Sequence, residues 1–212
     1  METWSDVGSN RRYKMNIIDD LLTVNDKVRP GTKLKGVKKI VMHWTGNLNA
    51  NAKENRNYWE SLESKNDGVS ASAHFVVDQD GTIIRCIPTD EKAYHVGTSQ
   101  LDPASGKLYT DYARDVFGDY ATATATPNNW TIGIELCPRL ATDSDSNDNG
   151  EFTDETLQAA AELVATLLKY YKLTTDDITT HQKIVGWKSC PKLFTDHPEE
   201  FDKFKNLVES FL

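Results

Sequence analysis

Short apolar runs alternate with amphipathic helical patterns along almost the whole 212-residue chain. The apolar runs are rich in β-branched residues and predict strands over 39–44, 73–77, 82–87, 131–136 and 178–181. The amphipathic stretches predict helices over 13–25, 51–63, 153–171 and 198–212. Because Asp80-Gly81 separates two of the runs, these two are expected to form an antiparallel hairpin. Interleaved strands and helices therefore predict an α/β fold, with a central mixed β-sheet flanked by helices.

The chain is expected to form a single domain, because no linker-like segment divides it and its length is close to that of one domain. Residues 1–12 carry no periodic pattern and predict a loose N-terminal arm, so the domain is expected to cover 13–212. The polar stretch 98–129 has only weak patterning, and we expect it to be an excursion on the surface.

The charge balance limits the partners of the chain. Its 24 Lys and Arg residues against 32 Asp and Glu residues give a net charge of -8, which disfavours binding to nucleic acid or to an anionic membrane. No apolar run approaches the ~18 residues that a membrane span needs, and the first residues lack the basic and apolar segments of a signal peptide. We therefore expect synthesis in the cytoplasm.

The cysteines and two of the histidines could form a metal site. An odd, widely spaced set of three cysteines predicts free or metal-bound thiols, with Cys86 and Cys137 packing as small hydrophobic residues. His43 and His181 lie at the ends of predicted strands, and Cys190 follows in a loop. Two imidazoles and one thiolate leave a fourth zinc position open, as in catalytic sites. On spacing alone, histidines buried for structural reasons are the more common explanation of this pattern.

Two further residues stand out within the predicted strands. Glu135 lies between Ile134 and Leu136, and a carboxylate among apolar residues needs either a partner or a function, which favours a catalytic role. His74 lies in an alternating strand, where a hydrogen-bonded core residue is the expected role. His197 precedes Pro198 and is expected to be exposed at the start of the last helix.

Five segments occur in an order that resembles one known family. They are HWTGN from His43, SAHFVVDQDG from Ser72, AYHVG from Ala93, TIGIEL from Thr131, and His181 with KSCP from Lys188. Together they resemble the zinc-dependent N-acetylmuramoyl-L-alanine amidases of the type-2 amidase family, which includes phage endolysins, bacterial autolysins and animal peptidoglycan-recognition proteins. The resemblance runs over 17–212 and is greatest to phage and prophage endolysins of Gram-positive hosts. It implies an enzyme that cleaves the amide between N-acetylmuramic acid and L-alanine with zinc-activated water.

The resemblance also implies roles for individual residues. It gives one zinc ion per chain, with His43, His181 and Cys190 as ligands. Glu135 would transfer the proton of the attacking water, and Lys188 would stabilise the oxyanion. His95 would contact the substrate, and Trp44 and Tyr94 are candidates for stacking on sugar or peptide.

The sequence departs from the family at one position, since Ala73 stands where some members have a tyrosine before the hairpin histidine. The implied substrate is peptidoglycan, reached after release from the cell in phage-type lysis. We expect a monomer with weak wall binding of its own, because the acidic chain gains no attraction to an anionic wall. A wall-binding module would belong to a longer form of the protein, come from another chain, or not be needed.

Three alternatives remain open at this point. One is a non-catalytic peptidoglycan-binding module on the same fold. Another is a metal-free hydrolase that uses Cys190 with His181. The third concerns an additional ion: residues 145–150 match the first half of a calcium loop, but Thr156 stands where the bidentate glutamate should be, so a solvated acidic turn is favoured.

Overall fold

The computed structural model describes residues 15–48, 50–65, 67–118, 126–139 and 150–212. The arm expected at 1–12 and nearly all of the calcium-type loop at 145–150 lie outside the described residues. Among the residues that are described, no helix is long and apolar enough to cross a membrane.

Six strands of the described chain form one mixed sheet in the order β1-β4-β3-β5-β2-β6. Their bounds are β1 Ile17–Asp19, β2 Lys39–Trp44, β3 Phe75–Val77, β4 Ile83–Arg85, β5 Thr131–Leu136 and β6 Ile178–Thr180. The hairpin of β3 and β4 is antiparallel, whereas the other neighbouring pairs are parallel. This confirms the predicted α/β class with a central mixed sheet.

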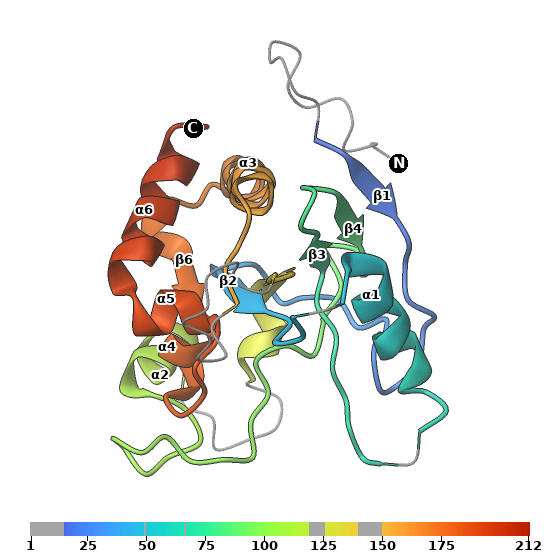
Figure 1. Ribbon diagram of the computed structural model, residues 1–212. Helices are drawn as coiled ribbons and strands as arrows, with labels where there is room; N and C mark the ends of the chain where they lie inside the picture. The colour runs from blue at the N-terminus through green and yellow to red at the C-terminus, as the bar shows by residue number, and fades with distance from the viewer. Residues whose placement is uncertain (1–14, 49, 66, 119–125, 140–149) are drawn as a thin grey trace.

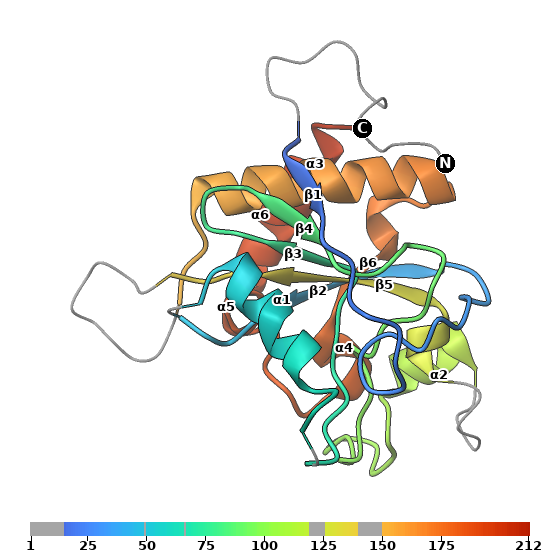
Figure 2. The ribbon, with the colours of Figure 1, turned by 90° about the vertical axis from the view of Figure 1, so that its right-hand side faces the viewer.

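Helices cover both faces of the sheet (Figures 1 and 2). They are α1 Ala52–Ser61, α2 Asp111–Phe117, α3 Asp154–Tyr171, α4 His181–Val185, α5 Lys192–Asp196 and α6 Pro198–Glu209, with short 3-10 turns η3 Pro127–Asn129 and η4 Thr175–Asp177. In Figure 2, α3 runs above the sheet, while α1, α2 and α4 lie below it.

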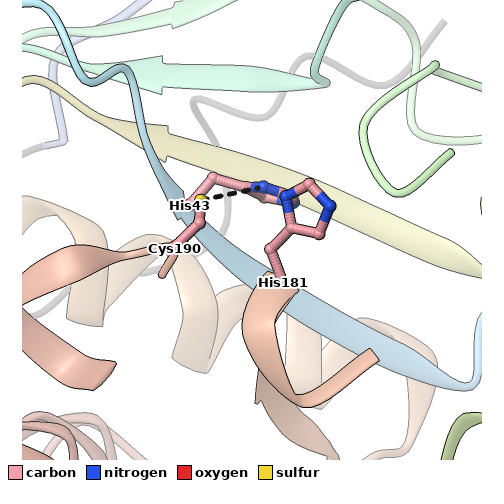
Figure 3. Close-up of side chains that lie close together, drawn as sticks. All are labelled: His43, His181 and Cys190. Carbon is pink, nitrogen blue, oxygen red and sulfur yellow. Dashed lines mark hydrogen bonds between the residues drawn. The ribbon is translucent and has the colours of Figure 1, made fainter. Parts of the chain in front are cut away.

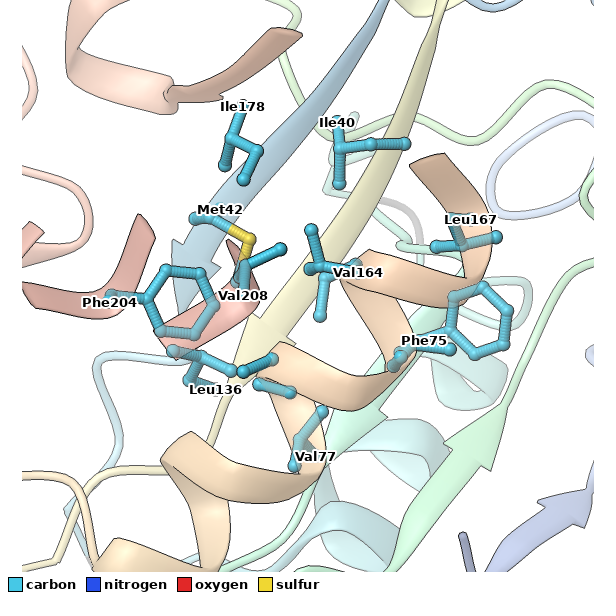
Figure 4. Packing of buried hydrophobic residues seen from close by; sticks show 14 of the residues in the cluster. Ile40, Met42, Phe75, Val77, Leu136, Val164, Leu167, Ile178, Phe204 and Val208 are labelled. Atoms are coloured by element: carbon cyan, nitrogen blue, oxygen red, sulfur yellow. The ribbon is translucent and has the colours of Figure 1, made fainter. Parts of the chain in front are cut away.

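The larger core lies between the sheet and α3 with α6 (Figure 4). Thr153 caps α3 by accepting a hydrogen bond from the Thr156 backbone N–H, and the apolar stripe of this helix faces the strands. Met42 of β2 and Leu136 of β5 point into this core. Because side chains alternate along a strand, the next residue back on each, Val41 and Glu135, faces the opposite side of the sheet.

That opposite face carries two smaller apolar clusters. One contains Val41 with the buried side chains of α2 and α4, and the other packs α1 against the hairpin. Both Cys86 and Cys137 are buried and free in the second cluster, which confirms their expected packing role. Polar side chains at the ends of the central strands lie on this same side of the sheet, and they form the candidate site.

Two expectations for secondary structure are corrected. The helix expected over 13–25 is instead the edge strand β1 followed by irregular chain, because Ile17 to Asp19 pair with Ile83 to Arg85 of the hairpin. A short apolar run can fit either the helical or the strand period. Here the run forms a strand because it pairs with the edge of the sheet. The excursion at 98–129 contains the helix α2, whose Ala113 and Phe117 are buried.

Candidate metal centre

Three parallel neighbours, β5, β2 and β6, bring the predicted site residues together. The register pairs His43 of β2 with Glu135 of β5, and Met42 with Thr180 of β6. His181 follows Thr180 directly and begins α4, so it lies next to His43. The carboxyl ends of parallel strands are a recurrent position for ligand sites, since loops and helix starts converge there.

Cys190 completes the group from the loop after α4. The backbone N–H of Gln182 donates to the Cys190 carbonyl at 3.0 Å, which holds this loop against the start of α4. Figure 3 shows the side chains of His43, His181 and Cys190 converging. One ligand atom from each lies within 4.8 Å of the other two, and all three residues are buried.

The geometry of this group fits a zinc ion. The Cys190 Sγ lies 3.7 Å from the His43 Nδ1. Tetrahedral zinc, with Zn–S near 2.3 Å and Zn–N near 2.0 Å, separates a sulfur and a nitrogen ligand by about 3.5 Å. Both ring nitrogens of His181 are buried and have no hydrogen-bond partner among the described residues. Orphaned buried nitrogens are rare in native proteins, and a metal ion is one partner that would satisfy them.

Burial favours the uncharged forms of the three candidate ligand side chains. It lowers the pKa of His181 to about 3 and that of His43 well below its ordinary value, with the neighbouring histidine adding to the second shift. Burial also raises the pKa of the Cys190 thiol to about 12. Neutral imidazoles are the form that binds metal, whereas the thiol must lose its proton to become a ligand.

Glu135 borders this group. Its Oε1 lies 4.0 Å from the His43 Nδ1, and its Oε2 is buried without a partner among the described residues. Burial raises the pKa of Glu135 to about 8, and the positive charge of Lys188 opposes the shift. Lys188 itself is exposed, in the loop just before Cys190. A carboxyl group with a pKa near neutrality can both accept and return a proton.

A cavity of about 360 Å³ opens beside Glu135 along α1. Apart from Ala50, its lining side chains are polar or aromatic, namely Thr45, Asn47, Glu54, Asn55, Tyr58, Trp59 and Glu135. The Thr45 hydroxyl is buried and has no hydrogen-bond partner within the described chain. This cavity was not predicted from the sequence. Tyr58 and Trp59, on the helix that follows the strand of His43, could have indicated it.

Trp44 and Tyr94, the two aromatic residues proposed from the sequence to contact substrate, lie outside the lining of this cavity. The Trp44 side chain packs against the larger core, on the opposite face of the sheet from His43. The Tyr94 ring is half-buried beside Lys92, whose Nζ lies 5.2 Å from the ring centroid. Within the described residues, neither ring lines the cavity next to Glu135.

His95 reaches the candidate metal centre and contacts protein groups there. It is 7% exposed, and its ring nitrogens contact His43 Nε2 at 3.0 Å and Thr131 Oγ1 at 3.1 Å. In this arrangement both ring nitrogens contact protein groups, one of them on the candidate ligand His43, and a contact of His95 with substrate stays a prediction. Gly133 makes room for the ring and was missed, although a glycine inside a strand signals a close approach.

The remaining histidines are as expected. His74 is fully buried, accepts a hydrogen bond from the Gly133 backbone N–H at 3.0 Å and bonds to the Glu91 carbonyl at 2.8 Å. It is therefore a structural core residue. His197 is exposed at the start of α6.

Comparison with known proteins connects this site to one family. The profile of the family described as N-acetylmuramoyl-L-alanine amidase matches residues 33–193, well over half of the chain. The N-acetylmuramoyl-L-alanine amidase BlyA of Bacillus subtilis (strain 168) is 32% identical over 190 residues, which are 89% of this chain and 46% of BlyA. A probable N-acetylmuramoyl-L-alanine amidase of Bacillus licheniformis is 31% identical over 198 residues, covering 93% of this chain and 48% of that protein. The chain thus spans about half the length of the curated relatives it matches.

Solved structures with the same fold include two proteins of similar size. A mutant endolysin from Bacillus subtilis superimposes with a TM-score of 0.62 at 25% identity, covering 92% of this chain and 99% of its own. The structure of PlyL superimposes with a TM-score of 0.64 at 22% identity, covering 93% and 99%, and supports the fold alone.

Proposed function

The chain belongs to the N-acetylmuramoyl-L-alanine amidase family, and from this premise we propose that it hydrolyses the amide between N-acetylmuramic acid and the L-alanine of the peptidoglycan stem peptide. The observation that carries the proposal is the convergence of His43, His181 and Cys190 beside Glu135 at the ends of adjacent parallel strands. Family membership alone would also fit a protein that only binds peptidoglycan. The retained ligand set and carboxylate favour hydrolysis.

In this proposal His43, His181 and Cys190 hold one zinc ion. When bound, zinc would act as a Lewis acid toward the amide carbonyl and would make the attacking water more acidic. The support from the chain is the 3.7 Å separation of the Cys190 sulfur and the His43 nitrogen, together with the unpartnered nitrogens of His181. Burial excludes solvent from the ligands, which strengthens each charge interaction within the site.

Glu135 acts as the proton carrier. Its carboxylate takes a proton from the attacking water and passes it to the nitrogen of the leaving L-alanine, so that the amide breaks with a neutral amine leaving. Two features support this role: its Oε2 has no partner among the described residues, and its Oε1 lies 4.0 Å from a ligand nitrogen of the proposed metal site.

Lys188 and the cavity along α1 serve the substrate. The Lys188 ammonium stabilises the negative charge that develops on the amide oxygen, and its effect on the pKa of Glu135 supports its proximity to the site. The cavity, at about 360 Å³, falls within the range of small-molecule sites and receives part of the muropeptide against Tyr58 and Asn47.

Wall targeting and assembly are also part of the proposal. The net charge of -8 gives no electrostatic attraction to an anionic cell wall. The matched relatives are about twice the length of this chain. We infer that the catalytic domain acts as a monomer and that a separate wall-binding module, on this or another chain, brings it to the peptidoglycan.

Product analysis tests the activity. Purified peptidoglycan is digested with the chain, and mass spectrometry follows the release of stem peptides with a free L-alanine amine. The proposal predicts such peptides with the wild type, none with Glu135→Gln, and none after chelation of the metal.

Two other results would replace the proposal. Saturable binding of muropeptides without a new amine would establish the non-catalytic module. Activity that survives chelation but is lost on thiol alkylation would establish the cysteine hydrolase, which the raised pKa of the buried Cys190 thiol disfavours.

A further inference from the structure

A chain of buried hydrogen bonds runs from the turn η3 to the proposed metal ligand His43. The Thr131 hydroxyl contacts the Pro127 carbonyl at 2.9 Å and the His95 Nε2 at 3.1 Å. The other nitrogen of that ring, the His95 Nδ1, lies 3.0 Å from the His43 Nε2. Thr131, His95 and His43 are each at most 7% exposed, so water does not compete for the hydrogen bonds between their side chains.

The direction of each hydrogen bond follows from the first one. A carbonyl oxygen can only accept, so the single hydroxyl proton of Thr131 is donated to Pro127. The Thr131 oxygen must then accept from His95, which places the His95 proton on Nε2. A neutral imidazole with its proton on Nε2 has a lone pair on Nδ1. His95 Nδ1 therefore accepts a hydrogen bond from the Nε2–H of His43, and the His43 Nδ1 is left with its lone pair.

The free lone pair faces the other proposed ligands. The His43 Nδ1 lies 3.7 Å from the Cys190 Sγ, on the side of the ring opposite the contact with His95. In the opposite tautomer, the proton would sit on Nδ1, between the imidazole and the metal position. Buried histidines exchange tautomers readily unless a partner selects one, so the identity of this partner matters for metal binding.

The surrounding fold holds the His95 ring in this position. The backbone N–H groups of His95 and Val96 both donate to the Asn128 Oδ1, at 3.1 and 3.0 Å, so the turn η3 that accepts the Thr131 hydroxyl also holds the backbone of His95. On the sheet side, an added Cβ at Gly133 would lie 2.6 Å from the His95 ring. The ring therefore packs directly on the β5 backbone, and its two nitrogens are held by Thr131 and His43.

We propose that Thr131 and His95 are positioning residues, which select the tautomer of His43 whose Nδ1 lone pair binds the metal. This inference rests on the proposed metal site, but the tautomer itself is a property of the metal-free protein. The carboxylate or backbone carbonyl that usually orients a metal-binding histidine is here a second histidine, oriented in turn by a threonine.

Nuclear magnetic resonance of the metal-free, ¹⁵N-labelled protein reads the tautomer directly. Long-range proton–nitrogen correlations distinguish the two neutral forms of each imidazole. We expect His43 and His95 to be in the Nε2–H form in the wild type. A His43 ring that carries its proton on Nδ1, or that populates both forms equally, would overturn the inference.

Matched variants test the consequence for metal binding, measured as zinc affinity in competition with a chelator. His95→Phe keeps a ring of similar volume without nitrogens, whereas His95→Asn keeps an acceptor near the position of Nδ1. Thr131→Val removes the hydroxyl from a side chain of the same shape, and Thr131→Ser retains it. We expect His95→Phe and Thr131→Val to weaken zinc binding about 10- to 100-fold with mixed His43 tautomers, and the two conservative variants to recover most of the affinity.

The outcomes separate this inference from the proposed function. Wild-type zinc affinity in both His95→Phe and Thr131→Val would overturn the positioning role while leaving the metal site intact. A wild-type protein that binds no zinc, with His43 still in the Nε2–H form, would overturn the proposed metal site and support the tautomer assignment. If His95→Phe does not fold, the Thr131 pair decides the question alone.

Discussion

Replacing Gly133 with alanine is expected to damage both the packing and the metal site, because the space that a Cβ would need is filled by His95. An added Cβ lies 2.6 Å from two ring atoms of His95, a separation that real Cβ atoms do not show. The backbone cannot retreat, since the Gly133 N–H and carbonyl are both hydrogen-bonded to His74, each at 3.0 Å. The His95 ring must therefore move away from β5.

The cost follows from what the displaced ring loses. Moving it breaks its hydrogen bonds to His43 and Thr131, worth about 1 kcal/mol each, and overpacking a buried site adds about 1–3 kcal/mol. We expect the free energy of unfolding to fall by about 4 kcal/mol, and the melting temperature by about 10 °C for a chain of this size. Zinc affinity should fall as well, because His43 loses its hydrogen-bond partner.

Urea and thermal unfolding of the metal-free protein measure this effect, with Gly97→Ala as the matched control. A Cβ at Gly97, an exposed position, would have its nearest contact at 3.7 Å, which is ordinary van der Waals distance. The control should therefore stay within about 0.5 kcal/mol of the wild type. If Gly133→Ala has the same free energy of unfolding and melting temperature as Gly97→Ala and the wild type, the close packing of His95 on β5 is refuted.

Three further predictions concern the proposed chemistry and the buried histidines. Lys188→Met should lower kcat on a muramoyl peptide about 10²- to 10³-fold at unchanged zinc content, and an unaltered kcat would remove Lys188 from the mechanism. Zinc at a hundred times its Kd should stabilise the fold by about 3 kcal/mol, so coincident melting curves with zinc and with chelator would argue against a folded-state metal site. Burial lowers the pKa of His74 from 6.5 to about 4, so the unfolded chain takes up this proton first as the pH falls. The stability of the metal-free protein should therefore be retained above pH 6.5 and decrease towards pH 4, with His74 contributing up to about 3 kcal/mol, and a flat profile by urea unfolding would contradict this.

Local patterns were sufficient for the strands and helices that form the centre of the fold. The apolar run at 39–44, the TIGIEL run at 131–136 and the amphipathic stretch at 153–171 correspond to β2, β5 and α3. The failure at 13–25 has a physical cause, because its apolar residues fit the helical period while the edge of the hairpin offers backbone hydrogen bonds. The residues of that segment give no indication of this partner, because Ile17 pairs with Ile83, which lies 66 residues later.

The candidate site divides in the same way. His43, His181, Cys190 and Glu135 could be singled out from strand ends, residue chemistry and the resemblance, and the structure brings them together through the register of β2 with its neighbours. The burial of His95 could not be predicted from its own segment. It depends on a missing side chain at Gly133 and a hydroxyl at Thr131, which reach it only when β5 enters the sheet.

Metal content tests the central claim most directly. Wild type, Cys190→Ser and Cys86→Ser are purified in parallel, and the amount of zinc per chain is determined by elemental mass spectrometry. Cys86→Ser is the control, because Cys86 is also buried and free but lies in the cluster between α1 and the hairpin. The account predicts close to one zinc per chain in the wild type and in Cys86→Ser, and a clear loss in Cys190→Ser. A folded wild-type protein that holds no zinc after dialysis against it, or a Cys190→Ser variant that retains the full amount, would contradict the proposed site.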